Sequence, residues 1–322
     1  MKFADALQVL LYSFPVALAQ INILDIDLSL LDDDPNDPKY CYDTTNQACG
    51  PGVWDTLPYS ENECGGNRQS PIAISSTSQC TNVTYDFNYY TGTCTWDDLV
   101  YEINDHSIKA VYPSSCDHPE VQIGSLVYEV AQWHVHLGQE HSIDGEFAAA
   151  AMHIVHSLKS DPLGEATEPF AVIGFGMKAD AEAGETNLDL DRMIYGFRDT
   201  AIQAANDCSL LGLGPTPTWF WEGTSSPWLT ANPYEILPSD PTFYQYLGSL
   251  TTPPCTEAVF WNFLSEYIPV SVAQLDFINN VILNYLDPNT CEKGTVADPM
   301  TGVTSRPPFT DAGRGVTKVG AC

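Results

Sequence analysis

Basic residues are scarce in this chain of 322 residues. Only 12 lysines and arginines stand against 42 aspartates and glutamates, which gives a formal net charge of −30 at pH 7. Because such a charge repels phosphate groups, we expect no binding to nucleic acid and none to an anionic membrane surface. Two explanations of the acidity remain open: a surface that only keeps the protein in solution, and a surface adapted to a salty exterior, where screening makes dense charge tolerable.

Long apolar runs are also missing. The N-terminal candidate, residues 7–18, is too short to cross a bilayer as an ordinary helix, so we expect no membrane span. It follows Lys2 and ends in Ala17-Leu18-Ala19, small residues typical of a cleavage site, although Asp5 is unusual in such a segment. The sequence therefore predicts a signal peptide over residues 1–19 and a secreted, extracellular or otherwise exported protein.

No Cys-x-x-Cys pair occurs, which argues against a zinc site built from cysteines. The chain nevertheless has ten cysteines, more than a cytosolic protein usually carries, and an oxidising compartment favours their pairing as disulfides. Cys41 with Cys49 is the simplest local pair. Asn82 begins an Asn-x-Thr acceptor pattern for N-glycosylation, which has a meaning only in a eukaryotic secretory route.

Helical patterns are few, and alternating patterns predominate after an acidic lead-in. Residues 20–39 end in Asp-Asp-Asp-Pro-Asn-Asp-Pro, which predicts a solvated linker without the ligand spacing of a known calcium loop. Residues 40–322 show no linker or repeat and are expected to form one mostly β domain with short helices at its periphery. Strand-like alternation covers residues 126–137, 147–155, 170–177 and 258–263, and partly helical segments are expected at 189–205 and 272–286.

Histidine is rare too, but five of the seven histidines lie between residues 134 and 156. Alternate residues of a strand share a face, so Gln132, His134 and His136 point to one side, with the two imidazoles about 7 Å apart. His153 can supply a third ligand if its strand is a neighbour. Three histidines and an open position are typical of a catalytic zinc. An isolated His-x-His pattern is more often structural, and His156, on the face opposite His153, is expected to be a core or surface histidine.

The order of these motifs resembles that of the alpha-type carbonic anhydrases over roughly residues 40–318. The segments that carry the resemblance are 64–72 (CGGNRQSPI), 104–107 (NDHS), 132–136 (QWHVH), 139–145 (QEHSIDG, similar to the family's SEH turn), 152–156 (MHIVH), 246–255 (YLGSLTTPPC), 269–271 (PVS) and 306–307 (RP). The short interval between His136 and Glu140 is similar to bacterial, plant and algal members. The resemblance implies a mostly β (α+β) single domain with a large, twisted, mixed but mainly antiparallel sheet, and the reversible hydration of carbon dioxide to bicarbonate and a proton.

The resemblance also implies the chemistry of the site. His134, His136 and His153 would hold Zn²⁺, whose bound water has a pKa near 7 and so provides hydroxide for attack on carbon dioxide. Glu140 as a carboxylate can only accept hydrogen bonds. It would take the hydroxyl proton of Thr251, and the Thr251 oxygen would then accept from the zinc-bound hydroxide and orient it.

Further roles follow from the same resemblance. His106 would shuttle the proton to solvent, because an unperturbed imidazole titrates near neutrality; a surface turn histidine is the alternative. Gln132 would orient His134. Cys64 and Cys255 would form a disulfide that holds the loop of Thr251. The apolar substrate pocket would be lined by Val155, Val172, Leu250, Thr251, Thr252, Val259 and Trp261.

The chain departs from the family pattern at a few positions. Ala151 stands where the family usually has a glutamate that bonds the third histidine. Such carboxylates raise the basicity of a ligating histidine and fix its tautomer, so we hypothesise faster zinc exchange or reduced turnover here. Thr304 and Ser305 occupy the stretch of the usual asparagine before Arg-Pro, and Phe309 replaces a glutamine. These changes concern local packing more than chemistry.

Two other classes of protein are weighed against an enzyme. An inactive binding module with this fold typically lacks one or more zinc histidines, whereas this chain keeps three together with Glu140 and Thr251. A secreted acidic matrix protein that controls carbonate mineral is compatible with the net charge, but no repeat or long acidic run supports it. The sequence does not determine the oligomeric state, and a homodimer is an open option.

Overall fold

The protein is described here from a computed structural model, which places residues 38–80, 87–179, 186–210, 226–284, 286, 290–311 and 313–320. The predicted signal peptide (1–19), all but the last two residues of the predicted linker (20–39) and the glycosylation candidate Asn82 lie outside these described residues.

Strands make up most of the regular structure. They are β1 (Ile72–Ile74), β2 (Gln79–Cys80), β3 (Phe87–Tyr90), β4 (Val100–Ile103), β5 (Ser107–Val111), β6 (Glu120–Ile123), β7 (Leu126–Leu137), β8 (Ser142–Ile143), β9 (Ala150–Ser160), β10 (Phe170–Ala179), β11 (Phe243–Gly248), β12 (Val259–Leu264), β13 (Ile268–Val270), β14 (Phe309–Thr310) and β15 (Thr317–Val319). The helices are α1 (Leu188–Leu210), α2 (Val272–Leu283) and the short 3-10 helices η3 (Pro51–Thr56) and η4 (Pro233–Ile236).

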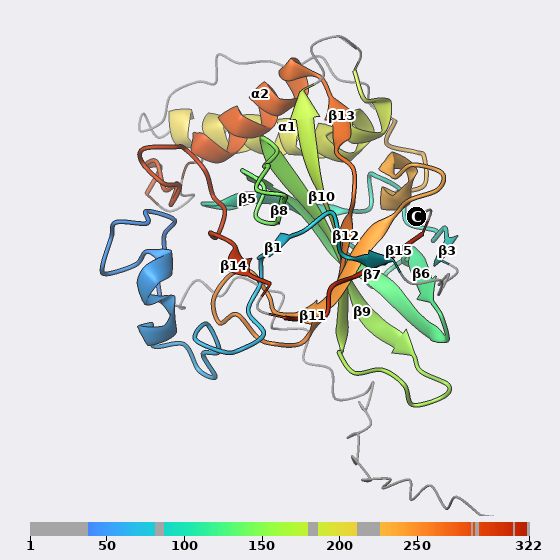
Figure 1. Ribbon diagram of the computed structural model, residues 1–322. Helices are drawn as coiled ribbons and strands as arrows, with labels where there is room; N and C mark the ends of the chain where they lie inside the picture. Colours follow the sequence, from blue (N-terminus) through green and yellow to red (C-terminus); the bar gives the residue numbers. More distant parts are fainter. Residues whose placement is uncertain are drawn as a thin grey trace, which may run out of the picture.

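Twelve of these strands form one large curled sheet, with the path β2-β15-β11-β12-β10-β9-β7-β5-β4 (Figure 1). β13 pairs with β10, and β6 joins β3 to β7. Only β10–β12, β10–β13 and β15–β2 are parallel within this sheet among the described residues; the other pairs are antiparallel. The mixed, mainly antiparallel sheet confirms the predicted fold class. A small parallel sheet, β14-β1-β8, lies beside it.

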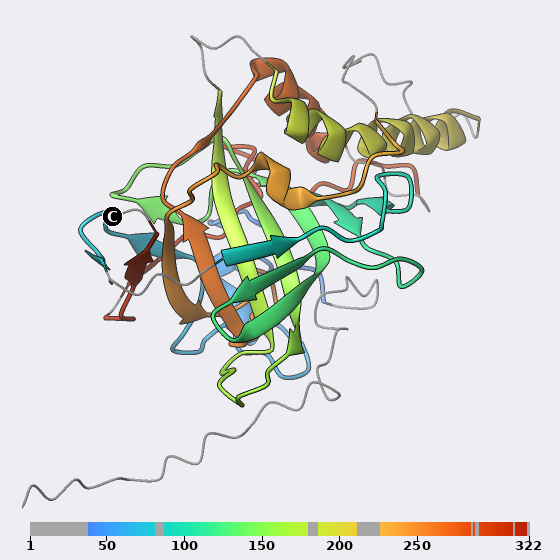
Figure 2. The same ribbon diagram turned by 90° about the vertical axis from the view of Figure 1, so that its right-hand side faces the viewer.

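The two central strands β9 and β10 are buried on both faces. Nine consecutive residues of β9 and eight of β10 are buried, the pattern of strands that are covered on each side. One face packs into the main core with residues such as Trp133, Ile154 and Phe197 of α1, and α1 lies beside α2 against this side of the sheet (Figures 1 and 2). The other face carries Val155 in a second apolar cluster. The site described below lies on this second face.

The segment boundaries differ from the sequence prediction most at β9 and α1, and by one to three residues at β10, β12 and α2. β9 begins at Ala150 rather than at 147, and the side chain of Phe147 is 47% exposed. At its far end β9 continues to Ser160, because the β7 ladder continues through Ser157 and Leu158. α1 is longer than the predicted 189–205. Asn187 caps it, since its side-chain oxygen accepts from the backbone N–H of Leu190 at 3.0 Å.

Four disulfides join described residues: Cys41–Cys49, Cys64–Cys255, Cys94–Cys116 and Cys208–Cys291. The second ties the segment before β1 to the loop after β11, which lie 191 residues apart. Within the part of the chain that the structure describes, neither long helix has the apolar length needed to cross a bilayer.

Candidate active site

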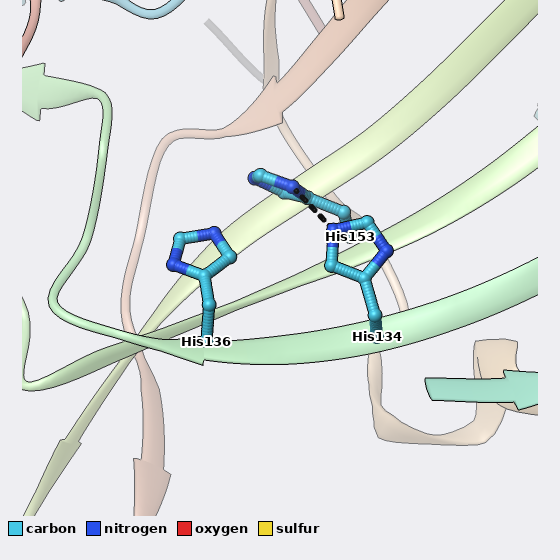
Figure 3. A group of neighbouring side chains, drawn as sticks. All are labelled: His134, His136 and His153. Carbon is cyan, nitrogen blue, oxygen red and sulfur yellow. Dashed lines mark hydrogen bonds between the residues drawn. The ribbon is translucent and has the colours of Figure 1, made fainter. Parts of the chain in front are cut away.

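Three histidines meet on the second face of the sheet. His134 and His136 lie on β7 and His153 on β9, and the antiparallel register places His134 directly opposite His153. His134 Nε2 and His153 Nδ1 are 3.2 Å apart, and one ring nitrogen from each of the three lies within 4.8 Å of the others (Figure 3). The alternation of one strand and the register of the next therefore bring together the three residues predicted as ligands.

The chemical state of these histidines fits a bound cation. His136 and His153 are buried, and both ring nitrogens of His136 and Nε2 of His153 have no hydrogen-bond partner among the residues that the structure describes. Burial lowers the pKa of His136 to about 3, and burial together with the neighbouring histidines lowers the pKa of His153 well below its usual value. Neutral imidazole is the form that binds a metal. A metal ion would take the lone pair of one nitrogen from each ring and so would remove part of the cost of burying these nitrogens unpaired. The residues therefore fit zinc.

Gln132 fixes the tautomer of His134. Its side-chain Oε1 lies 3.0 Å from His134 Nδ1. Because an amide oxygen only accepts hydrogen bonds, Nδ1 carries the proton and the lone pair of Nε2 faces the cluster. Gln132, which lies two positions before His134 on the same strand face, is thus placed to orient the His134 ring.

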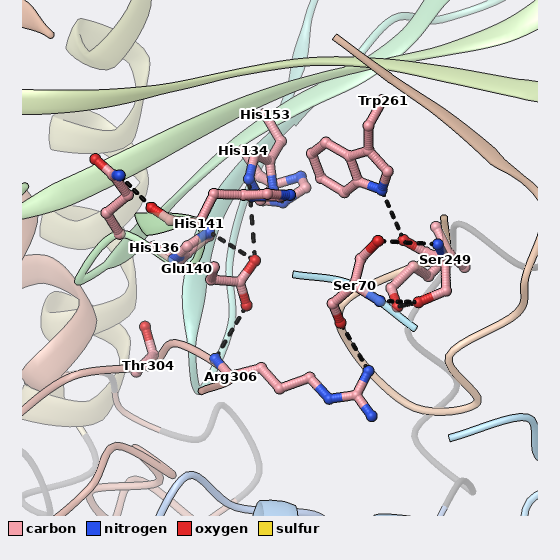
Figure 4. Close-up of polar contacts among 12 residues, drawn as sticks. Ser70, His134, His136, Glu140, His141, His153, Ser249, Trp261, Thr304 and Arg306 are labelled. Carbon is pink, nitrogen blue, oxygen red and sulfur yellow. Dashed lines mark hydrogen bonds and ion pairs between the residues drawn. The ribbon is translucent and has the colours of Figure 1, made fainter. Parts of the chain in front are cut away.

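Glu140 is buried between the histidines and the chain near the C-terminus (Figure 4). Its Oε1 accepts from the backbone N–H of Arg306 at 3.1 Å, and its Oε2 lies 3.5 Å from His136 Nε2 and 3.9 Å from His153 Nε2. Burial raises the pKa of Glu140 to about 7, against the opposing effects of the Arg306 N–H, the Thr251 hydroxyl and the Arg306 charge. The structure brings Glu140 and Thr251 together.

Arg306 holds the edge of this site, a role that the sequence reasoning missed. Its buried guanidinium donates through Nη1 to Gln69 Oε1 and to the Ser70 carbonyl, each at 2.8 Å, and through Nη2 to the Cys64 carbonyl at 3.1 Å. It therefore connects the segment of residues 64–70 to Glu140. The only signal in the sequence was the Arg-Pro pair, which carries no contact information by itself.

Ser70 in turn fixes the loop after β11. Ser70 N–H donates to Ser249 Oγ at 2.8 Å, and Ser249 N–H donates to Ser70 Oγ at 3.0 Å (Figure 4). In the same loop the backbone N–H of Cys255, whose sulfur is bonded to Cys64, donates to the Thr252 carbonyl at 2.8 Å. Thr251 is thereby held from both sides.

An apolar wall begins at His153. Four of the residues predicted for the substrate pocket belong to one buried cluster and lie at neighbouring positions on β9, β10 and β12: Val155, Val172, Val259 and Trp261. Leu250 packs against this cluster. The ring centroids of His153 and Trp261 are 5.0 Å apart, and the Trp261 indole N–H donates to the Ser249 carbonyl at 2.9 Å. Thr251 is buried and Thr252 half-buried beside this wall.

His106 comes directly before β5, whose first residue, Ser107, is opposite His136. It is a covered residue rather than the exposed turn histidine considered as its alternative, with 8% of its surface accessible. Asp105 and Tyr40 contact its ring. Neither contact was foreseen from the sequence.

A large mixed sheet with three clustered histidines, a buried carboxylate and an adjacent apolar wall defines a candidate metal site of the three-histidine class. The profile of the eukaryotic-type carbonic anhydrases matches residues 49–317. The chain therefore belongs to the eukaryotic-type, or alpha, carbonic anhydrase family and is a carbonic anhydrase enzyme.

Known proteins resemble this chain in sequence or in fold. The chain is 29% identical to carbonic anhydrase 4 of Oryctolagus cuniculus over 249 residues, which cover 71% of this chain and 70% of that protein. Its fold is similar to that of the alpha carbonic anhydrase of Thermovibrio ammonificans solved with sulfanilamide, with a TM-score of 0.59, 23% identity and coverage of 87% and 99% of the two chains. It is also similar to dioscorin solved with ascorbate, with a TM-score of 0.60, 19% identity and coverage of 88% and 99%.

Proposed function

We propose that the protein catalyses the reversible hydration of carbon dioxide to bicarbonate and a proton at a zinc ion held by His134, His136 and His153. The observation that carries the proposal is the cluster of three ring nitrogens within 4.8 Å, two of its histidines buried with unpartnered nitrogens. Zinc in such a site supplies a nucleophile at neutral pH, because it lowers the pKa of a bound water from 15.7 to about 7.

The chain's own residues would orient and supply the reactants. Gln132 holds the lone pair of His134 Nε2 toward the cluster. Glu140 as a carboxylate accepts a hydrogen bond from the Thr251 hydroxyl, so the Thr251 oxygen is left to accept a hydrogen bond from another group in the site. Carbon dioxide, which is small and apolar, would lie against the wall formed by Val155 and Trp261.

His106 would take up the proton that the reaction releases. It lies one residue before Ser107, which is opposite His136, and so stands at the end of a strand that flanks the candidate ligands. A histidine is suited to this task because its ring can accept a proton at one nitrogen while the other keeps its own.

We also propose that the enzyme acts outside the cytosol, with residues 1–19 as its signal peptide, 20–39 as an acidic linker and 40–322 as the catalytic domain. The support is the set of four disulfides, which an oxidising compartment favours. N-terminal sequencing of the exported protein tests this proposal, and a start at Gln20 is the expected result.

The function is tested by stopped-flow hydration of carbon dioxide by the purified oxidised protein, with zinc assayed on the same sample. We expect about one zinc per chain and rapid hydration, both lost in His153→Ala and both kept in His118→Ala, which changes a histidine outside the cluster. Zinc without hydration would indicate a binding or matrix protein. Neither zinc nor hydration in the wild type would show that the fold serves another purpose.

A further inference from the structure

His106 is enclosed by an aromatic cover from the N-terminal part of the domain. The Tyr40 hydroxyl lies 3.3 Å from His106 Nε2 and 3.4 Å from Nδ1, and the ring centroids of Tyr40 and Tyr42 are 5.7 and 6.2 Å from that of His106. Trp54 packs edge-on against both tyrosines at 5.3 and 5.6 Å. The Cys41–Cys49 disulfide closes this segment. The His106 ring therefore has little freedom to swing into solvent.

Asp105 engages one nitrogen of the enclosed ring. Asp105 Oδ1 lies 2.8 Å from His106 Nδ1, and the side chain of Asp105 is 27% exposed while that of His106 is 11% exposed. The backbone holds this arrangement, because Val296 N–H donates to the Asp105 carbonyl at 3.0 Å and Ser107 N–H donates to Asn104 Oδ1 at 2.7 Å. The backbone of the turn that carries Asp105 is thus held on both sides, and the Asp105 carboxylate lies beside the ring.

A carboxylate in this position decides which nitrogen of His106 can accept a proton. Ionised Asp105 only accepts hydrogen bonds, so Nδ1 must carry the proton and the lone pair must lie on Nε2. An aspartate that bonds Nδ1–H of a histidine acts in this way in other catalytic sites, where it holds the tautomer and the ring orientation without being protonated itself. The aromatic cover prevents the ring from escaping that orientation.

We propose that Asp105 is a positioning residue for proton transfer, which holds His106 in the Nδ1–H tautomer so that Nε2 is the nitrogen that accepts the proton released by the reaction. In the forward step, a bond forms between the proton and Nε2 while the Nδ1–H···Asp105 hydrogen bond is kept. Loss of the proton from Nε2 to buffer returns the ring to its starting tautomer. The inference rests on the proposed function, since it specifies how the proposed shuttle works.

The test separates proton transfer from the conversion of carbon dioxide in the zinc-loaded enzyme. We expect Asp105→Asn to lower the maximal hydration rate in dilute buffer by about tenfold, below the 10²–10⁴-fold range of a full general acid–base contribution, with kcat/KM for carbon dioxide unchanged. The asparagine amide can donate to Nδ1 and so favour the wrong tautomer. High concentrations of imidazole buffer should restore the rate, and Asp105→Glu should keep more of it than Asp105→Asn.

Three comparisons make the outcome decisive. Asp55→Asn removes an equal charge from an exposed position and should leave the rate unchanged. In the double variant, Asp105→Asn should cause no further loss of the dilute-buffer rate beyond that of His106→Ala, because both substitutions affect the same proton-transfer step. Nitrogen-15 chemical shifts of the His106 ring should report protonated Nδ1 in the wild type and a change in Asp105→Asn.

The two proposals fail in distinguishable ways. If His106→Ala lowers the dilute-buffer rate but Asp105→Asn does not, or if the nitrogen shifts of the two proteins agree, the role of Asp105 is overturned and the proposed shuttle survives. A zinc-loaded enzyme whose dilute-buffer rate is unaffected by His106→Ala overturns both the shuttle and this inference. Absence of hydration in the wild type removes the proposed function itself.

Discussion

Ala151 lies directly across the β7–β9 ladder from His136, and its methyl group leaves His153 without a carboxylate from its own strand. On the other side Ala151 is opposite Gly176 of β10. A Cβ at Gly176 would collide with Oε1 of Gln139, whose amide donates to the His141 carbonyl and accepts from the Ala148 N–H at 3.2 Å. Gln139 therefore fills space next to Ala151, and it stands where the family's SEH turn has serine.

This arrangement predicts that Ala151→Glu improves zinc retention only when Gln139 is also replaced by a smaller residue. Carboxylates that bond a ligating histidine typically change metal affinity 10- to 100-fold, so Ala151→Glu with Gln139→Ser should release zinc about tenfold more slowly than the wild type. Ala151→Glu alone should cost about 1–3 kcal/mol of stability through overpacking. Transfer of zinc to a chromophoric chelator measures the rates, with Gln139→Ser as the matched control. Equal release rates for all four proteins would refute the hypothesis.

Thr251→Ala should impair chemistry without releasing zinc. The Thr251 hydroxyl contacts Glu140, and both are held by the network of Arg306. Loss of one preorganised hydrogen bond in an active site typically costs about 10²–10³ in rate, so we expect kcat/KM for hydration to fall about 10²-fold at unchanged zinc content. Thr77→Ala, on the exposed surface, is the control. A rate within a factor of two of the wild type would show that Thr251 is only a turn residue.

His156 should make the fold sensitive to acid independently of the metal site. Its ring lies between the Ala171 carbonyl, 3.0 Å from Nδ1, and the Tyr234 hydroxyl, 2.9 Å from Nε2. Burial lowers the pKa of His156 to about 4 from 6.5. The unfolded chain therefore binds a proton at His156 more tightly than the folded chain does. The contribution of neutral His156 to the free energy of unfolding is fully present above pH 6.5 and is lost as the pH falls toward 4.

The shift corresponds to about 3 kcal/mol, at 1.36 kcal/mol for each pKa unit. Urea unfolding at pH 7 and pH 4.5 should show a smaller loss of stability in His156→Gln than in the wild type, because glutamine cannot take up the proton. If the two proteins lose the same stability over this interval, His156 is not the group responsible.

The Cys64–Cys255 disulfide should stabilise both the domain and the loop of Thr251. It closes a loop of 191 residues, and loss of a native disulfide typically costs about 2–5 kcal/mol. Cys64→Ala/Cys255→Ala should therefore lower the free energy of unfolding by that amount and reduce hydration more than Cys208→Ala/Cys291→Ala, whose disulfide joins α1 to the segment after α2. Equal losses of activity in the two double variants would contradict a specific effect on the loop.

Chelation of zinc should lower stability without unfolding the protein. The three histidines lie on central strands of the large sheet, so the fold is held by core packing as well as by the metal. A ligand present at 1,000 times its Kd stabilises the native state by about 4 kcal/mol. The difference in melting temperature between zinc-loaded and chelated protein should be present in the wild type and absent in His153→Ala, as differential scanning calorimetry can measure.

Local patterns were enough for the strand faces and for the pair His134 and His136, and family resemblance was needed for His153 and for the partners of these histidines. Alternation predicted that His134 and His136 share a face, but only the pairing of β7 with β9 places His153 opposite His134. The expected start of β9 at 147 was wrong because alternation continued into the irregular segment before the strand, where Phe147 is exposed.

The contacts that could not be predicted all join distant segments. Arg306 reaches Gln69 across 237 residues, and Tyr40 covers His106 across 66. Such contacts depend on how the whole sheet curls, and neither spacing nor periodicity records that. For the same reason the burial of His106 could not be predicted from the sequence.

Because the chain is synthesised from its N-terminus, the sequence separation of two cysteines determines how early their disulfide can form. Cys49 follows Cys41 after eight residues, whereas Cys255 follows Cys64 after 191. At a synthesis rate of about 5–20 residues per second, Cys64 waits about 10–40 s for its partner, and Cys80 and Cys94 are made during that wait. Until Cys255 has been synthesised, the free thiol of Cys64 can form disulfides with the wrong cysteines. The disulfide that holds the loop of Thr251 therefore forms only after most of the sheet has been synthesised.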